Sequence, residues 1–211
     1  MKTPDRYLTN FLIREVIRND EYMLGSINKP IDYVIDIGAN VGIFALHALT
    51  LLKINKQIIS LEPEPNNFKC LQHNVKHPKA ILSNNAIGEG KLFLTKNPRN
   101  TGMYQCSPNA EGIEVQPLTL KEIVNKYNIS GDVIMKCDCE GGEVYLMNKE
   151  AMQIMDTFLH IAFELHYGDE YFSEFPSKEE YIEWFSTFTN HNILYQNWKN
   201  YKNGHVVLTR K

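Results

Sequence analysis

The sequence predicts an α/β fold, a mostly parallel β-sheet with helices on both faces. Apolar segments of strand length alternate along the chain with segments of helical periodicity. Because crossovers between parallel strands are almost always right-handed, this alternation places helices on both sides of one sheet. The 211 residues, of which 43% are hydrophobic, suit a single domain with a sizeable core. We expect that domain to span 1–211, with an N-terminal helical segment at 1–30 and the sheet-containing core at 31–211.

The first half of the chain supplies three strands and three helices. Leu8, Phe11, Leu12, Val16 and Ile17 fall on one face of a helix that would cap the sheet or a ligand. The segment 43–53 is apolar almost all round, as expected of a helix buried against a sheet. The expected elements are a helix over 8–18, a strand over 32–37, a helix over 43–53, a strand over 57–61, a helix capped by Asn66 or Asn67 that ends before Pro78, and a strand over 80–86.

The second half begins with an insertion of strand character. Segments 91–96 and 113–118 predict an inserted β-hairpin after the third strand, and Asn203-Gly204 predicts the turn of a C-terminal antiparallel hairpin. The strand over 132–137 carries an unusual internal charge, Lys136. The remaining expected elements are a helix over 118–127 capped by Thr119, a helix over 143–155, a strand over 158–165, a helix over 178–187, and hairpin strands over 193–198 and 205–209.

Charge and composition favour a small-molecule partner. The formal net charge is -3, which argues against a broad electrostatic footprint for nucleic acid or an anionic membrane. The N-terminal residues lack the pattern of a secretion signal, and no apolar run approaches the roughly 18 to 20 residues that span a bilayer. We therefore expect a cytoplasmic protein with no membrane span. The sequence does not indicate an oligomeric state.

The stretch VIDIGANVGIF, Val34 to Phe44, predicts a site for a nucleotide-like ligand. A short apolar strand ends at Asp36 and enters a turn in which Gly38 permits a tight bend and Gly42 permits close packing or close ligand approach. A dinucleotide turn would carry a middle glycine to clear room for a pyrophosphate, but Ala39 and Asn40 occupy the intervening positions. The ligand is therefore expected not to be a dinucleotide.

Polar residues gather where the predicted strands end. Ligands of open α/β sheets bind at the carboxyl ends of the strands, so these side chains are candidates for one site. Glu62 follows the second strand, where a carboxylate suits the two hydroxyls of a ribose. The full set of strand-end residues is Asp36, Glu62, Asn84, Asn85, Asp138, Glu140, Glu164 and His166.

Four motifs resemble the FkbM-type methyltransferases, a family within the class I S-adenosylmethionine-dependent fold. They are VIDIGANVGIFAL, LEPEPNNFKCLQHNV, NNAIG and VIMKCDCEGGEVYLM, and the last contains the string Lys-x-Asp-x-Glu-Gly-x-Glu from Lys136 to Glu143. The resemblance covers about Asp32 to Leu165. It implies a Rossmann-like class I methyltransferase fold with a seven-stranded sheet, S-adenosylmethionine as cofactor, and O-methylation of a hydroxyl on a carbohydrate or secondary metabolite.

The resemblance also implies a cofactor site. Gly38, Asn40 and Gly42 would line the methionine part, and Asp36 would reach its ammonium group directly or through water. Glu62 would bind the ribose hydroxyls, and Asp138 would lie nearest the sulfonium. Pro63 would lie along the adenine, whose edge would meet Asn85 and the backbone of Ala86.

An alcohol acceptor must lose a proton. The candidates for the base are four strand-end residues, Asp138, Glu140, Glu164 and His166. We favour Asp138, with Glu140 or His166 contacting the acceptor; Glu164 and Tyr167 complete the expected acceptor site. The segment from Tyr167 to Phe175 is expected mainly to pack in the core, although it could form a lid.

Two further interpretations concern charge at these strand ends. Asp138, Glu140, Glu164 and His166 could instead bind a divalent metal, although we expect none. Lys136 is expected to be a buried counter-ion for one of the carboxylates, on the same side as Asp138 and Glu140 if the strand stays extended.

Two other functions remain open. A nicotinamide-dependent oxidoreductase would need the pyrophosphate turn that Ala39 and Asn40 do not provide. A non-catalytic S-adenosylmethionine-binding module would bind the cofactor without turnover.

Overall fold

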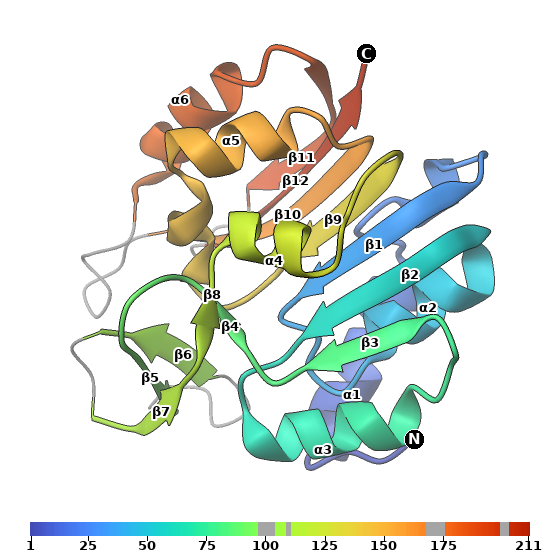
Figure 1. Ribbon diagram of the computed structural model, residues 1–211, viewed down its shortest axis with the longest axis vertical. Helices are drawn as coiled ribbons and strands as arrows, with labels where there is room; N and C mark the ends of the chain where they lie inside the picture. Colours follow the sequence, from blue (N-terminus) through green and yellow to red (C-terminus); the bar gives the residue numbers. More distant parts are fainter. Residues whose placement is uncertain (97–103, 109–110, 168–175, 199–202) are drawn as a thin grey trace.

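A seven-stranded sheet runs through the middle of the molecule (Figure 1). The computed structural model describes residues 1–211 except 97–103, 109–110, 168–175 and 199–202. The strand order is β11-β12-β10-β9-β1-β2-β3. The bounds are β1 (Ile31–Ile37), β2 (Ile54–Leu61), β3 (Ala80–Ser83), β9 (Val133–Cys137), β10 (His160–His166), β11 (His191–Trp198) and β12 (Asn203–Arg210).

Pairing within the sheet confirms the expected fold class. Five adjacent strands are mutually parallel, namely β10, β9, β1, β2 and β3. In contrast, β12 is antiparallel to both β10 and β11. The sheet is therefore mostly parallel and ends in an antiparallel hairpin. Because its parallel strands have a common direction, their carboxyl ends meet at one edge.

Helices cover both faces of the sheet (Figure 1). One hydrophobic cluster packs α4 (Leu120–Lys126), α5 (Lys149–Met155) and α6 (Lys178–Ser186) on one face. The other cluster packs α2 (Ile43–Leu51), α3 (Pro65–Asn74) and the N-terminal segment on the opposite face. That segment consists of α1 (Arg6–Ile13), a π-helical turn η1 (Arg14–Arg18) and a 3-10 turn η2 (Leu24–Ser26). Among the described residues, no helix combines the length and apolar character that a membrane crossing needs.

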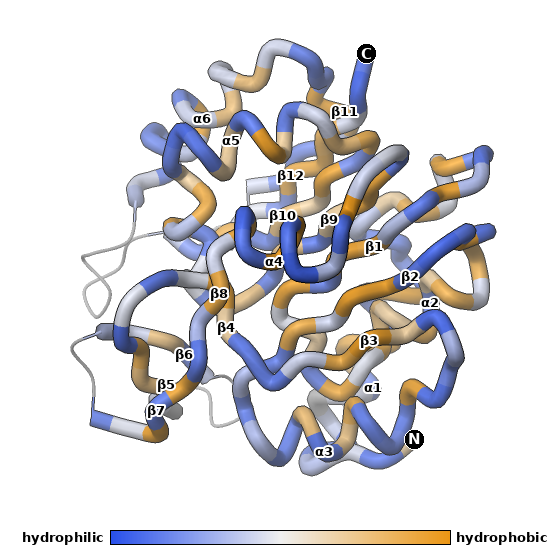
Figure 2. Tube along the Cα trace, in the orientation of Figure 1, coloured by the Kyte–Doolittle hydropathy of each residue, from blue (hydrophilic) through white to orange (hydrophobic). Residues whose placement is uncertain are grey.

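The central strands are hydrophobic along most of their length (Figure 2) but carry one polar row. In the pairing register, Asp36 of β1 lies opposite Ser60 of β2 and opposite Lys136 of β9. All three residues are buried. Neighbouring strands thus place an acid, a base and a hydroxyl side by side, which allows the buried charges to neutralise each other.

The inserted segment forms a separate three-stranded sheet with the order β6-β5-β7. The expected hairpin is present as the antiparallel pair of β5 (Leu92–Lys96) and β7 (Ile113–Val115), and β6 (Tyr104–Ser107) adds a strand to it. The strand expected over 80–86 is interrupted: β3 ends at Ser83, and β4 (Ala86–Ile87) pairs with β8 (Pro117–Leu118).

Local hydrogen bonds correct two expected helices. The first residue of α3 is Pro65, and the Glu64 carboxylate, not Asn66 or Asn67, accepts the capping hydrogen bond from Asn67 N–H. The helix expected over 143–155 is divided into a 3-10 turn η3 (Gly142–Leu146) and α5. Asn148 caps α5 by accepting a hydrogen bond from Ala151 N–H, so the second helix has its own start.

Two further expectations differ from the structure. Asn203 and Gly204 belong to β12, where Gly204 pairs with Leu165, so they are not the hairpin turn. The connection between β11 and β12 lies within 199–202, outside the described residues. On the N-terminal helix, Val16 is buried as expected, but Phe11 and Ile17 are exposed.

Candidate functional site

A cavity of about 660 Å³ opens at the carboxyl ends of the parallel strands. Its walls come from the N-terminal helix, from the segments that follow β1, β2, β3 and β9, and from β6, β10 and β12. The predicted site residues that line it are Gly38, Asn40, Glu62, Pro63, Asn85, Ala86, Asp138, Glu140 and Glu164. Most of the predicted set is therefore brought to one place.

The glycine turn after β1 fits tightly against the ends of its two neighbouring strands. Gly38 has a φ of +75°, and a Cβ there would lie 1.7 Å from the backbone oxygen of Asp138. The N–H groups of Gly38 and Ala39 both donate to the Leu61 carbonyl, over 3.0 and 2.9 Å. Only glycine allows both this backbone angle and this close approach.

Glu62 directly follows β2 and contacts the same turn from the other side. Its Oε2 accepts a hydrogen bond of 2.7 Å from Asn40 N–H, and its Oε1 accepts one of 2.8 Å from Glu64 N–H. Burial raises the pKa of Glu62 to about 7, against the lowering effect of these backbone donors. Each carboxylate oxygen has further lone-pair capacity, and the residue lines the cavity. A pair of vicinal hydroxyls, such as those of a ribose, fits this acceptor.

Asp138 lies at the end of β9, in a network of buried groups. Its Oδ2 accepts a hydrogen bond of 2.8 Å from the Tyr22 hydroxyl and lies 3.7 Å from Lys136 Nζ. Lys136 Nζ also donates to the Gly38 carbonyl over 2.6 Å and lies 3.4 Å from Asp36 Oδ1. Burial alone would lower the pKa of Lys136, but Asp138 and Asp36 raise it above its ordinary value. Lys136 is therefore the expected buried counter-ion, shared between two carboxylates.

Two predicted cofactor residues occupy other positions than expected. Asp36 does not extend off the sheet edge: it is fully buried and is held by Lys136 and by a 3.3 Å hydrogen bond from Ser60 Oγ. Gly42 is also absent from the cavity lining. A Cβ at Gly42 would lie 2.6 Å from Val75 and 2.8 Å from Leu71, so its glycine serves the packing of α2 against α3.

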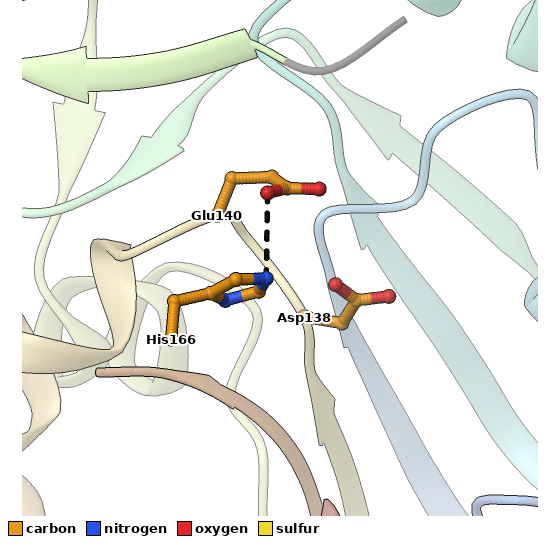
Figure 3. Close-up of side chains that lie close together, drawn as sticks. All are labelled: Asp138, Glu140 and His166. Atoms are coloured by element: carbon orange, nitrogen blue, oxygen red, sulfur yellow. Dashed lines mark ion pairs between the residues drawn. The ribbon is translucent and has the colours of Figure 1, made fainter. Parts of the chain in front are cut away.

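His166, Glu140 and Glu143 form a second cluster beside the cavity. Figure 3 shows the His166 ring facing Glu140, with Asp138 nearby. His166 Nε2 lies 3.3 Å from Glu140 Oε2, and His166 Nδ1 lies 2.7 Å from Glu143 Oε1. Glu140 has a φ of +54°, so the chain turns there and does not continue the strand direction of Lys136 and Asp138. The strand does not stay extended as far as Glu140, so the condition under which these three side chains were expected to share one side is not met.

Burial and the neighbouring charges shift the pKa values of Glu140 and His166 in opposite directions. Burial raises the pKa of Glu140 to about 8, although the neighbouring His166 lowers it. Burial would lower the pKa of His166, but the carboxylates of Glu140 and Glu143 raise it well above its ordinary value. A carboxylate whose pKa is near 8 is a stronger base than an ordinary one, which suits proton abstraction near neutral pH.

Three of the four residues considered for a metal lie together. Asp138, Glu140 and His166 each offer a ligand atom, and these atoms lie within 4.8 Å of one another. Glu164 is not in this group. Its Oε1 accepts a 2.6 Å hydrogen bond from Asn203 Nδ2 and lies 3.5 Å from His205 Nε2.

The expected acceptor residues His166 and Tyr167 are absent from the described cavity lining. The Tyr167 hydroxyl donates to the Asn203 carbonyl over 3.3 Å, and its ring packs near Trp198. The remainder of the expected lid segment, 168–175, lies outside the described residues.

The end of the cavity near Glu62 is lined by the segment after β3 and by the inserted sheet. Asn85 accepts a hydrogen bond of 2.6 Å from Ser83 Oγ and donates one of 3.0 Å to the Gln116 carbonyl, and Ala86 N–H donates to the same carbonyl. Tyr104 and Cys106 of β6 also line this end.

Sequence reasoning missed three residues of the site. Tyr22 and Asn203 line the cavity, and Glu143 holds His166. A signal was present only for Glu143, which belongs to the Lys136 to Glu143 string but was expected in an ordinary helix. Tyr22 and Asn203 come from outside the predicted strand ends of the parallel sheet.

The model of the methyltransferase FkbM domain matches residues 36–195. The chain belongs to the FkbM methyltransferase family. A search of the curated proteins gave no match. Membership of this family confirms the expected resemblance, and it excludes the nicotinamide-dependent oxidoreductase as the family-level function. S-adenosylmethionine is the methyl donor of the family. The Glu62 carboxylate, which lines the cavity beside the glycine turn, is a hydrogen-bond acceptor that fits the ribose hydroxyls of this cofactor.

Solved structures of methyltransferases share the fold of this FkbM chain. An FkbM methyltransferase from Methylobacillus flagellatus matches with a TM-score of 0.55 and 14% identity, over 89% of this chain and 46% of that one. A protein from Clostridium thermocellum described as an rRNA methylase matches with a TM-score of 0.54 and 12% identity, over 92% and 94%. A Streptococcus mutans protein described as a methyltransferase, solved with S-adenosylhomocysteine, matches with a TM-score of 0.51 and 12% identity, over 92% and 97%. At these identities the likeness concerns the fold alone.

Proposed function

We propose that this FkbM-family protein transfers the methyl group of S-adenosylmethionine to a hydroxyl of a small-molecule acceptor, a carbohydrate or a secondary metabolite. The observation that carries the proposal is the position of Glu140. This carboxylate lines the same cavity as the glycine turn and Glu62, and its pKa is raised to about 8 by burial. A base of this strength beside the cofactor site is what an alcohol acceptor requires.

The cofactor would lie along the line from Glu62 to Asp138. Glu62 would accept the ribose hydroxyls, and Pro63 would lie along the adenine. The Asp138 carboxylate, held by Tyr22 and Lys136, would face the ammonium of the methionine part. When bound, S-adenosylmethionine supplies a methyl group already activated by the sulfonium, whose sulfur keeps the electron pair of the broken carbon–sulfur bond.

We assign proton removal to Glu140 in place of Asp138, which we favoured from the sequence. Asp138 already accepts a hydrogen bond from Tyr22 and lies beside the Lys136 ammonium, so its carboxylate is already engaged by two groups of the protein. Glu140 lies 3.3 Å from the His166 ring but, within the described residues, is not paired with Lys136 as Asp138 is. The acceptor oxygen would form its bond to the methyl carbon as its proton passes to the Glu140 carboxylate.

The walls of the cavity favour a small acceptor over a nucleic acid. The carboxyl groups of Glu62, Asp138 and Glu140 line the cavity, and Lys136, the one lysine there among the described residues, is paired with two carboxylates. The described lining therefore offers a phosphate backbone no unpaired lysine. Tyr7 and Phe11 of α1 line the cavity and are largely exposed, so they offer an apolar wall to the acceptor.

Glu140→Gln tests the proposal. We expect the variant to bind S-adenosylmethionine as tightly as the wild type in calorimetry, but to lose on the order of a hundredfold in turnover with a hydroxylated acceptor. Glu150→Gln is the matched control, because Glu150 is an exposed glutamate paired with Lys121 on the surface. Full turnover in Glu140→Gln would remove the assigned base. Cofactor binding with no methylated product from any hydroxylated acceptor would favour a non-catalytic module.

A further inference from the structure

We infer that Glu143 is a positioning residue: its buried carboxylate fixes the His166 ring so that the opposite ring nitrogen faces Glu140. The inference rests on the proposed function, because it concerns the group that receives the acceptor proton. Glu143 itself is absent from the described cavity lining, so it would act through His166 and not on the acceptor.

The geometry is that of an imidazole held between two carboxylates. Glu143 Oε1 lies 2.7 Å from His166 Nδ1, and Glu140 Oε2 lies 3.3 Å from His166 Nε2. The ring therefore has one close contact on the buried side and one longer contact on the cavity side. The shorter contact fixes the ring orientation, and with Nδ1 donating to Glu143 the proton on Nε2 points toward Glu140.

Burial of the Glu143 carboxylate costs free energy that the neighbouring His166 can offset. The residue is fully buried, and its Oε2 has no hydrogen-bond partner among the described residues. A buried carboxylate with few partners is expensive unless an opposite charge compensates it. The His166 imidazolium is the only cation that the structure places against it within the described part of the chain. The ion pair with His166 thus offsets the cost of the buried carboxylate and also holds the ring.

Other charged or titratable groups surround the pair on several elements. Asp138 and Glu164 add negative charge from the ends of β9 and β10, and His205 of β12 lies 3.5 Å from Glu164. The Tyr181 hydroxyl of α6 donates to the His166 carbonyl over 3.3 Å. Cys137 and Cys139 face Glu143 from β9 and the segment after it. Among these groups, Glu140 and Glu143 alone have carboxylate oxygens within 4.0 Å of the His166 ring nitrogens in the described residues.

The arrangement has a defined consequence for Glu140. An imidazolium at His166 lowers the pKa of Glu140 and keeps it available as a carboxylate. Removing the negative charge of Glu143 makes His166 easier to deprotonate, which weakens that effect. The Glu143 charge also raises the pKa of Glu140 directly, but this effect is smaller than that of the His166 imidazolium. Where His166 loses its proton, the pKa of Glu140 would therefore rise, and the acidic limb of the pH–rate profile would move to higher pH.

The test uses the full chain with Glu143→Gln, which keeps the side-chain shape but loses the charge. The pKa of the His166 ring, followed by NMR in the protein without cofactor, should fall by about 1 to 3 pH units. Turnover at neutral pH should fall about tenfold or more, with unchanged affinity for S-adenosylmethionine. The double variant Glu143→Gln/His166→Gln should be no slower than His166→Gln alone, because Glu143 acts through the ring.

Glu150→Gln again serves as the surface control, and Glu143→Asp, which restores the charge, should recover part of both the His166 pKa and the rate. A His166 pKa that is unchanged in Glu143→Gln would overturn the inference. A double variant whose loss of turnover equals the product of the two single losses would also overturn the inference. If wild-type protein methylates no hydroxylated acceptor, the proposed function fails, but the NMR titration still decides whether Glu143 controls His166.

Discussion

The Tyr22 hydroxyl donates a 2.8 Å hydrogen bond to Asp138 Oδ2, joining the N-terminal segment to the end of β9 across 116 residues of sequence. The Tyr22 ring is buried and packs edge-on against Phe44, with ring centroids 5.4 Å apart. Burial and the Asp138 carboxylate both raise the pKa of this hydroxyl, so it remains a donor at physiological pH. Asp138, in the cavity lining, is therefore held by Tyr22 of the N-terminal segment as well as by Lys136 of the sheet.

Tyr22→Phe should keep the ring packing and remove only this hydrogen bond. We expect a loss of about 1 to 2 kcal/mol in the free energy of unfolding, because Asp138 loses one of its two stabilising partners. We also expect weaker binding of S-adenosylmethionine. Urea unfolding and calorimetry measure the two effects. Tyr195→Phe on the exposed side of β11 is the control, and an equal loss there would show that the Asp138 contact is unimportant.

Gly38→Ala should be far more damaging than Gly90→Ala. Both glycines have positive φ, +75° and +71°, so alanine is strained at either position. At Gly38 the new Cβ would also meet the Asp138 backbone oxygen, whereas at Gly90 nothing lies within 4 Å. We expect a cost of about 1 kcal/mol at Gly90 and several times that at Gly38, with loss of cofactor binding. Equal unfolding midpoints for the two variants would contradict the close approach of the turn to β9.

The affinity for S-adenosylmethionine should depend on pH through Glu62. Its pKa of about 7 in the folded protein means that the carboxylate form, which accepts the ribose hydroxyls, becomes dominant only above that pH. Calorimetric affinity should therefore increase between pH 6 and 8 in the wild type. Glu62→Gln should bind weakly at all these pH values, whereas Glu114→Gln, an exposed glutamate of β7, should follow the wild type. A flat wild-type profile would argue against Glu62 as the ribose acceptor.

The same group should make the protein without cofactor less stable as pH rises. The pKa of Glu62 is raised from 4.5 to about 7 on folding, so the folded protein holds this proton more tightly than the unfolded chain. The contribution is fully present below pH 4.5 and is lost as pH rises toward 7, by up to about 3 kcal/mol. Urea unfolding of wild type and Glu62→Gln, compared from pH 5 to 8, isolates it. A stability difference between the two proteins that does not change with pH would contradict the raised pKa.

Metal chelation should leave methyl transfer unchanged. The Asp138, Glu140 and His166 side chains are close enough to hold an ion, but Lys136 and Tyr22 already hold Asp138, and His166 already compensates Glu140. Turnover before and after treatment with a chelator tests this, with added Mg²⁺ or Mn²⁺ as the comparison. Loss of activity that a divalent ion restores would establish the metal interpretation in place of the ion pair.

Much of the fold and part of the site could be predicted because both depend on local signals. Strand and helix periodicity gives the sheet, and the rule that ligands bind at the carboxyl ends of parallel strands brings Glu62, Asp138 and Glu140 together. The orientation of Asp36 could not be obtained in this way. Its side chain turns into the sheet because Lys136 lies opposite it on the adjacent strand β9, a pairing that depends on the spatial order of the strands.

The residues that were missed depend on long-range placement. Tyr22 is 116 residues from its partner Asp138, and Asn203 reaches the cavity only because β12 lies between β10 and β11. Asn203-Gly204 has the sequence of a turn, but pairing with Leu165 and His166 draws both residues into a strand. Local propensity was overridden there by the sheet.

The contacts of Lys136 also bear on the order in which the molecule assembles. Its ammonium donates to the carbonyls of Ile37 and Gly38, which precede it by 99 and 98 residues. Contacts so distant in sequence require the chain to close a long loop, which costs conformational entropy. While β9 is unpaired, the DIGANVG segment lacks the cation that fixes its carbonyls. We therefore expect the turn to bind the cofactor only after β9 has paired with β1, and a partly folded chain without this pairing not to bind it.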